Sequence, residues 1–140
     1  MTRTVKFEKL IQADHKLVFK EISNFETYVN YVPGCSKAVL VERTDAYEVG
    51  KLEFNLLFKN YSITSKNYIS DNEIKIEQID GPFISFEGEW RVIKKDKNIT
   101  KITFTANFEL PSLLNNLLSD NSIDIFFENS LEGFLDKLSD

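Results

Sequence analysis

The chain has 140 residues, 42% of them hydrophobic, and its 17 basic and 22 acidic side chains leave a net charge of −5. This length suits a single domain, residues 1–140, that buries roughly 70% of its unfolded surface. One cysteine excludes an internal disulfide framework, and the longest unbroken apolar run, Ala38 to Val41, is far too short to span a membrane. Charged residues from Arg3 onward do not fit a signal peptide, so we expect a cytoplasmic protein.

The acidic balance also argues against DNA as a partner, because the phosphate backbone would be repelled. Phenylalanine is abundant, at 12 residues. Large aromatic rings suit a pleated sheet or the lining of a wide cavity better than tightly packed helices. The composition therefore favours a sheet-rich protein with an aromatic interior.

The N-terminal part of the chain predicts one strand followed by two helices. Apolar and polar residues alternate over Thr4–Leu10, which is typical of a strand. Asp14 can cap a helix on which Val18 and Ile22 share one face. A second short helix is predicted over Phe25–Val32, ended by the Pro-Gly pair that follows it.

The middle of the chain predicts six antiparallel strands joined by short turns. Each has one apolar and one polar face, the pattern of a meander with one buried side. The predicted strands are Lys37–Arg43, Tyr47–Phe58, Tyr61–Ser70, Glu73–Ile79, Ile84–Ile93 and a last strand that contains Ile102–Phe108.

The C-terminal part predicts a helix. Pro111 ends the last strand, leucines follow from Leu113, and apolar residues from Ile123 to Leu138 recur at three- and four-residue steps. The predicted order is β-α-α-β6-α, an α+β fold in which a seven-stranded antiparallel sheet wraps around the long terminal helix. A helix lying across the open side of the sheet would leave an apolar cavity beneath it.

The inventory of catalytic groups is small. The sequence has no phosphate-binding glycine loop, zinc-protease motif or paired cysteines. The one histidine, His15, falls in the first turn of a predicted helix, and Cys35 falls in a loop where a small buried side chain is the simpler interpretation. We therefore expect no catalytic residues and no metal site.

The apolar interior is the stronger signal. Inward-facing side chains in this pattern indicate either a solid core or a pocket for a hydrophobic ligand. Gly88 lies among inward rings, where it leaves space or admits a neighbouring backbone. The candidate ligand-binding residues are Phe54, Phe58, Phe86, Gly88, Trp90, Phe104 and Phe108 on the strands and Phe126 and Phe127 on the last helix.

Three motifs carry a family resemblance. The run Asp80-Gly81-Pro82-Phe83, with Phe86, Gly88 and Trp90 after it, resembles the DGPF..L.G.W signature of the coenzyme Q-binding, START-like family. Tyr28 and the segment Tyr31-Val32-Pro33-Gly34-Cys35 resemble its Y..FLPGC motif, and Thr64-Ser65-Lys66-Asn67 resembles its Thr-Thr-Arg-Asn strand.

The resemblance implies a helix-grip fold of the polyketide cyclase/dehydrase-like superfamily. The Gly-Pro turn before Phe83 indicates either a plain hairpin corner or a rim element that admits a ligand. The expected rim residues are Pro33, Cys35, Pro82 and Phe83. The resemblance further implies that the ligand is a polyprenyl quinone of the ubiquinone type, held by a lipid chaperone that supports respiratory electron transport and uses no catalytic cofactor. The implied alternative is a toxin that binds the large ribosomal subunit and blocks subunit association. An enzyme of the cyclase type is a third interpretation, disfavoured because the interior is expected to lack acid–base groups.

A quinone carrier must meet the bilayer in which its ligand resides. We therefore expect a transient contact with a membrane surface, peripheral at the inner membrane, made by an amphipathic helix. The terminal helix is the candidate, through Phe126, Phe127, Leu131, Phe134 and Leu135, unless these side chains cover the sheet.

Overall fold

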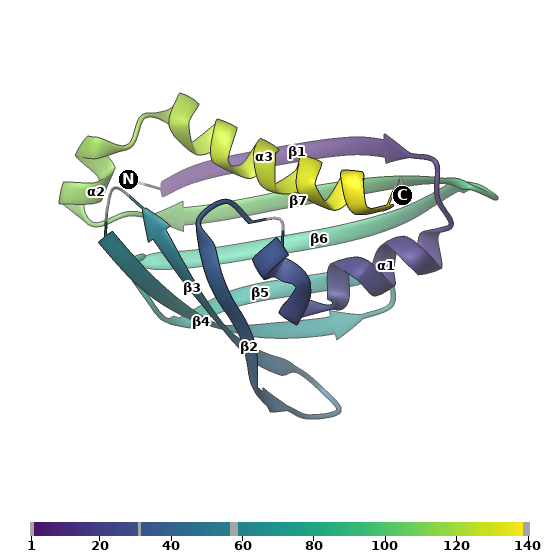
Figure 1. The fold of residues 1–140 in the computed structure, drawn as a ribbon, viewed down its shortest axis with the longest axis horizontal. Coiled ribbons are helices and arrows are strands. Elements are labelled where there is room, and N and C mark those ends of the chain that lie inside the picture. Colours follow the sequence, from purple (N-terminus) through teal and green to yellow (C-terminus); the bar gives the residue numbers. More distant parts are fainter. Residues whose placement is uncertain (1, 31, 57–58, 139–140) are drawn as a thin grey trace.

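The chain forms one curved antiparallel sheet with its helices on the concave side (Figure 1). The computed structural model describes residues 2–30, 32–56 and 59–138. In chain order the elements are β1 (Thr2–Ile11), α1 (His15–Ser23), the 3-10 helix η1 (Phe25–Asn30), β2 (Cys35–Arg43), β3 (Glu48–Leu56), β4 (Lys59–Ser70), β5 (Glu73–Asp80), β6 (Ser85–Asp96), β7 (Ile99–Glu109), α2 (Ser112–Leu117) and α3 (Asp120–Leu138).

The seven strands lie in the order β1-β7-β6-β5-β4-β3-β2, and every neighbouring pair is antiparallel. Strands β2 to β7 therefore form a continuous meander, to which β1 is added beside the last strand. The predicted α+β helix-grip, START-like fold is confirmed, with the six-residue helix α2 at the predicted helical entry before α3.

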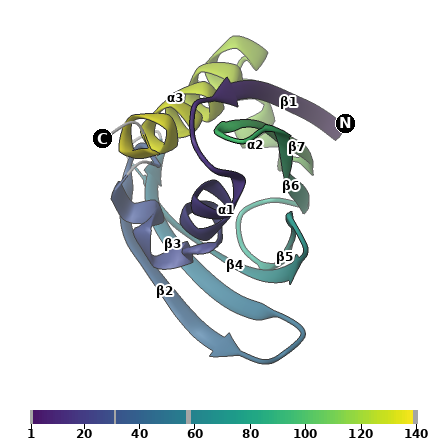
Figure 2. The same ribbon diagram turned by 90° about the vertical axis from the view of Figure 1, so that its right-hand side faces the viewer.

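Helix α1 fills one end of the concave side. Asp14 caps it by accepting a hydrogen bond from the backbone N–H of Lys16, and Val18 and Ile22 are completely buried. Seen from that end, the sheet curls around α1, and α3 lies beside it across the concave side (Figure 2). None of the helices within the described ranges combines the length and the apolar character needed to cross a bilayer.

The predicted second helix is a 3-10 helix over Phe25–Asn30. Of the two further predicted positions, Tyr31 lies outside the described residues and Val32 is not helical. The first residue of the helix, Phe25, is buried against β3. A Cβ atom on Gly50 would lie 2.5 Å from the Phe25 ring, so only glycine lets the ring approach this closely. This close approach fixes the start of η1 on the sheet.

The strand faces follow the predicted alternation over most of the sheet. On β7 the inward residues Ile102, Phe104, Ala106 and Phe108 are all buried, as predicted. Ile84 is an exception, because β6 begins only at Ser85 and the Ile84 side chain is exposed. Its backbone N–H donates to Glu109 O at 2.8 Å, but its side chain points away from the core.

Candidate ligand-binding site

A cavity of about 220 Å³ lies between the concave face of the sheet and α3. Almost all of its lining is apolar, and most of the predicted ligand-binding residues lie on it. Those on the lining are Phe54, Phe86, Trp90, Phe104, Phe108, Phe126 and Phe127, together with the predicted rim residues Cys35, Pro82 and Phe83.

Phe127 joins α3 to the sheet across one side of this larger cavity. Its ring centroid lies 5.8 Å from that of Phe104, 6.1 Å from that of Phe108 and 6.4 Å from that of Phe7. These are normal separations for packed aromatic pairs. The helix is therefore attached through side chains that also line the cavity, and a ligand there would contact both layers.

Gly88 does not line the larger cavity, contrary to the expectation that it leaves space there. A Cβ atom on Gly88 would lie 3.4 Å from the Phe86 ring and 3.5 Å from the Phe104 ring, which is ordinary contact. These two rings therefore already occupy the space above the glycine. Pro33 is likewise absent from the cavity lining among the described residues.

Two residues of the sequence hypotheses, Tyr31 and Phe58, lie outside the described residues. Conversely, the lining includes side chains that the sequence reasoning did not select. Phe7, Tyr28 and Tyr61 are the aromatic members of this group. Phe7 and Tyr61 have the inward parity of their strands, so the alternation could have identified them. Tyr28 enters the sequence hypotheses only as part of a family motif, and its place on the lining depends on how η1 packs on the sheet.

The rim loop between β5 and β6 is held by one side chain. Gln78 Nε2 donates to the carbonyl oxygen of Phe83 at 2.9 Å, and the backbone N–H of Phe83 donates to Gln78 Oε1 at 3.2 Å. This two-point attachment positions the Phe83 ring 5.1 Å from Phe86 and 5.6 Å from Phe108. Phe83 thus belongs to the aromatic cluster of the cavity.

Helix α2 lies at the end of the molecule opposite α1 (Figure 1), and its Leu114 lines the larger cavity. Arg3 on β1 attaches this helix to the sheet. Its Nη2 donates to the carbonyl oxygen of Asn115 at 2.8 Å and its Nε donates to Asn115 Oδ1 at 3.1 Å. Its Nη1 lies 3.4 Å from Asp120 Oδ1, within ion-pair range but without a hydrogen bond.

A smaller cavity of about 110 Å³ adjoins the larger one near α1 and η1. Three buried polar side chains on its lining, Glu48, Ser65 and Asn67, make it chemically different. The expectation that the interior lacks acid–base groups is therefore wrong at this end. The parity of β3 places Glu48 on the same face as Leu52, a signal that the alternation contained.

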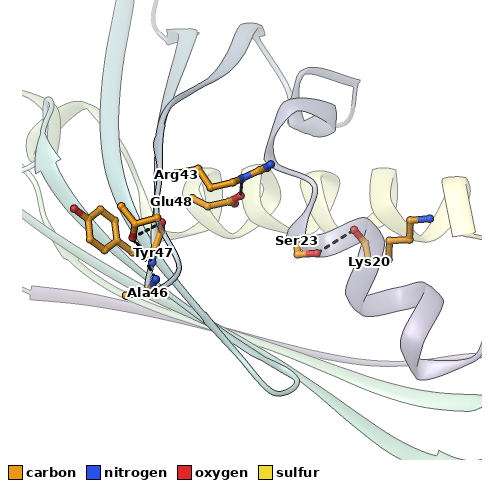
Figure 3. Close-up of polar contacts among 7 residues, drawn as sticks. Lys20, Ser23, Arg43, Ala46, Tyr47 and Glu48 are labelled. Carbon is orange, nitrogen blue, oxygen red and sulfur yellow. Dashed lines mark hydrogen bonds and ion pairs between the residues drawn. The ribbon is translucent and has the colours of Figure 1, made fainter.

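The Glu48 carboxylate is paired at the edge of the smaller cavity. Arg43 Nε lies 2.6 Å from Glu48 Oε2, and Arg43 itself is largely exposed (Figure 3). Ser23, at the end of α1, donates its hydroxyl hydrogen to Lys20 O at 3.1 Å and also lines this cavity.

Neither His15 nor Cys35 forms a nucleophile–base pair. His15 Nδ1 lies 3.1 Å from Asp14 Oδ1, and His15 does not line either cavity. Burial raises the pKa of the Cys35 thiol, which favours its protonated form. Within the described part of the chain, no three His, Cys, Asp or Glu side chains are grouped as metal ligands would be.

The family model for polyketide cyclase/dehydrase and lipid transport proteins matches residues 11–134. Among curated proteins, the ribosome association toxin RatA of Vibrio cholerae is 21% identical over 133 residues, covering 94% of this chain and 92% of that protein.

Solved structures show the same fold. The Zhui aromatase/cyclase of Streptomyces sp. R1128 superposes with a TM-score of 0.87 at 18% identity, covering 99% of this chain and 94% of the other. A START superfamily protein of Mycobacterium smegmatis gives 0.78 at 16% identity, covering 96% and 98%. The START-like resemblance in the sequence motifs is thereby confirmed, and the chain belongs to the polyketide cyclase/dehydrase and lipid transport family.

Proposed function

We propose that the protein binds a polyprenyl quinone of the ubiquinone type in the larger cavity and acts as a lipid chaperone that supports respiratory electron transport. The observation that carries this proposal is the cavity of about 220 Å³ with an almost entirely apolar, aromatic lining. Burial of apolar surface contributes about 25 cal/mol per Å², so an isoprenoid chain can be held without any dedicated polar group.

The chemistry of the lining supports binding over catalysis. The polar side chains among its described residues are two tyrosines, two serines and Cys35, with no Asp, Glu, His, Lys or Arg among them. A cyclase would be expected to place a general acid or base beside its substrate. Among the described lining residues of the two cavities the one carboxylate is Glu48, which is paired with Arg43. In the proposed role this pairing holds Glu48 as a binding group, the ligand is bound and released unchanged, and no catalytic cofactor takes part.

Organic extraction of the purified protein followed by mass spectrometry tests this proposal. We expect a quinone with an isoprenoid tail in the extract, in an amount that follows the amount of protein. An extract with no quinone from protein purified out of quinone-producing cells contradicts the proposal.

The alternative is a toxin that binds the large ribosomal subunit and blocks subunit association. The relatives named ribosome association toxin favour it. The net charge of −5 and the presence of only three arginines disfavour it, because ribosomal RNA presents phosphates. A ribosome sedimentation profile with added protein separates the two: accumulation of free subunits supports the toxin, and an unchanged profile supports the carrier.

A further inference from the structure

The inner face of β3 and β4 changes from apolar to polar along its length. In the register of the two strands, Leu52 of β3 pairs with Ile63 of β4, and Glu48 pairs with Asn67. Ser65 lies between Ile63 and Asn67 on β4. Glu48, Ser65 and Asn67 are 8%, 6% and 5% exposed. Buried polar groups in such a position are costly unless they have hydrogen-bond partners.

The Ser65–Asn67 pair keeps hydrogen-bonding capacity for a ligand. Ser65 Oγ donates to Asn67 Oδ1 at 2.9 Å, which leaves both hydrogens of Asn67 Nδ2 for another acceptor. If the amide is turned over, the Ser65 hydroxyl hydrogen and the amide oxygen are left instead. In either orientation the pair can donate to an oxygen atom in the smaller cavity.

Glu48 adds an acceptor to the same space. Arg43 occupies Oε2 of this carboxylate, so Oε1 is left to accept from a hydroxyl group. A ligand oxygen could therefore be held as a carbonyl by the Ser65–Asn67 pair or as a hydroxyl by Glu48.

The smaller cavity borders the larger one and has room for the oxygen-bearing edge of a ring rather than for a whole ring. It measures about 110 Å³, less than the cavity of about 150 Å³ that binds benzene in another protein. The side chains that line both cavities are Tyr28, Leu52, Ile63, Ile76 and Phe86.

We infer that the smaller cavity is the subsite for the oxygen-bearing edge of the ligand's ring, and that the rest of the ring and the apolar chain lie in the larger cavity and extend toward α2. This inference rests on the proposed function, because it assigns an orientation to the same ligand. It adds Ser65, Asn67 and Glu48 as specificity-determining residues that select for ring oxygens.

The test compares two probes that share a ten-carbon chain and differ in the ring. Decylubiquinone carries oxygen atoms on its ring, and decylbenzene carries none. Affinities are measured for the wild type, Asn67→Leu, Ser65→Ala and the control Asn98→Leu in the exposed β6–β7 turn. We expect Asn67→Leu to weaken decylubiquinone binding by about fivefold to tenfold, the effect of one lost hydrogen bond. Ser65→Ala acts in the same direction, and the control has no effect.

Decylbenzene affinity is expected to stay unchanged in all variants, which also shows that the cavity is intact. If both probes lose affinity equally, or if neither does, the orientation is wrong while the apolar pocket of the proposed function stands. If the wild type binds neither probe, the proposed function itself fails and the orientation falls with it. Should Asn67→Leu fail to fold, the Ser65→Ala comparison decides by the same criteria.

Discussion

At the scale of single residues, Gly88 controls how far two rings project into the larger cavity. A Cβ atom there would meet Phe86 and Phe104 at 3.4–3.5 Å, so Gly88→Ala fits without displacement. Gly88→Leu must push the rings toward the cavity. We expect its quinone retention to fall several fold, because the displaced rings of Phe86 and Phe104 take up volume of the larger cavity that the ligand needs. Quantitative extraction measures this, with Gly88→Ala as the matched control, and equal retention in both variants would show that the rings do not shape the site.

Cys35 provides a reporter of cavity occupancy, because it lines the larger cavity and is the only cysteine of the chain. Since burial raises its pKa, the reactive thiolate forms only at higher pH than in an unfolded chain. Alkylation by iodoacetamide should therefore be slower than in the urea-unfolded protein at pH 8, and the two rates should approach each other as the pH rises.

Decylubiquinone in the cavity should slow the alkylation of Cys35 further, because the ligand covers the thiol. Mass spectrometry at intervals gives the rate. Labelling of the folded protein at the unfolded rate, with no effect of the ligand, would place Cys35 outside the occupied space.

At the scale of secondary-structure elements, the attachment of α2 to β1 offers a test of where a ligand enters the larger cavity. Arg3 contributes two hydrogen bonds to Asn115 and lies near Asp120, while Leu114 of the same helix lines the cavity. Hydrogen bonds from a charged group contribute about 1.5–3 kcal/mol each. We expect Arg3→Ala to accelerate both uptake and release of decylubiquinone by about tenfold, with a smaller change in affinity.

Stopped-flow fluorescence of Trp90, the only tryptophan, follows this exchange. Arg91→Ala is the matched control, because Arg91 pairs with Glu73 and Glu89 and does not line either cavity. If Arg3→Ala exchanges ligand at the wild-type rate, α2 does not limit access.

The strands also show which features of the fold and the site can be predicted from the alternation of apolar and polar residues. Alternation predicted the strands and the inward rings of β6 and β7 because one buried face requires it. It could not predict that the rings of Phe86 and Phe104 fill the space above Gly88, since ring directions depend on contacts between strands. The polar subsite was missed for another reason. Ser65 and Asn67 made their strand look solvated, and only the curvature of the sheet over α1 and η1 buries them.

At the scale of the whole molecule, we propose α2 as a further candidate for the membrane contact. Of the α3 residues expected to make it, Phe126, Phe127 and Leu131 line the larger cavity, whereas the side chains of Phe134 and Leu135 lie outside the described part of the chain. Leu113 and Leu117 of α2 are 72% and 59% exposed, and Leu114 of the same helix lines the larger cavity. If the ligand enters at α2, this exposed apolar pair would let it pass between lipid and protein.

This contact should be weak and reversible, because two leucines bury little surface and the net charge of −5 is repelled by anionic lipid. Liposome flotation with and without quinone measures it. We expect Leu113→Ser with Leu117→Ser to reduce the floated fraction and the rate of quinone transfer by several fold, about 1 kcal/mol for each exposed leucine that inserts. Leu17→Ser is the control, since Leu17 is also exposed but lies on α1, at the opposite end of the molecule (Figure 1).

Because the attachment is apolar, added salt should leave the floated fraction unchanged or raise it slightly. Strong binding that disappears as salt rises would instead indicate an electrostatic attachment and contradict this route for the ligand.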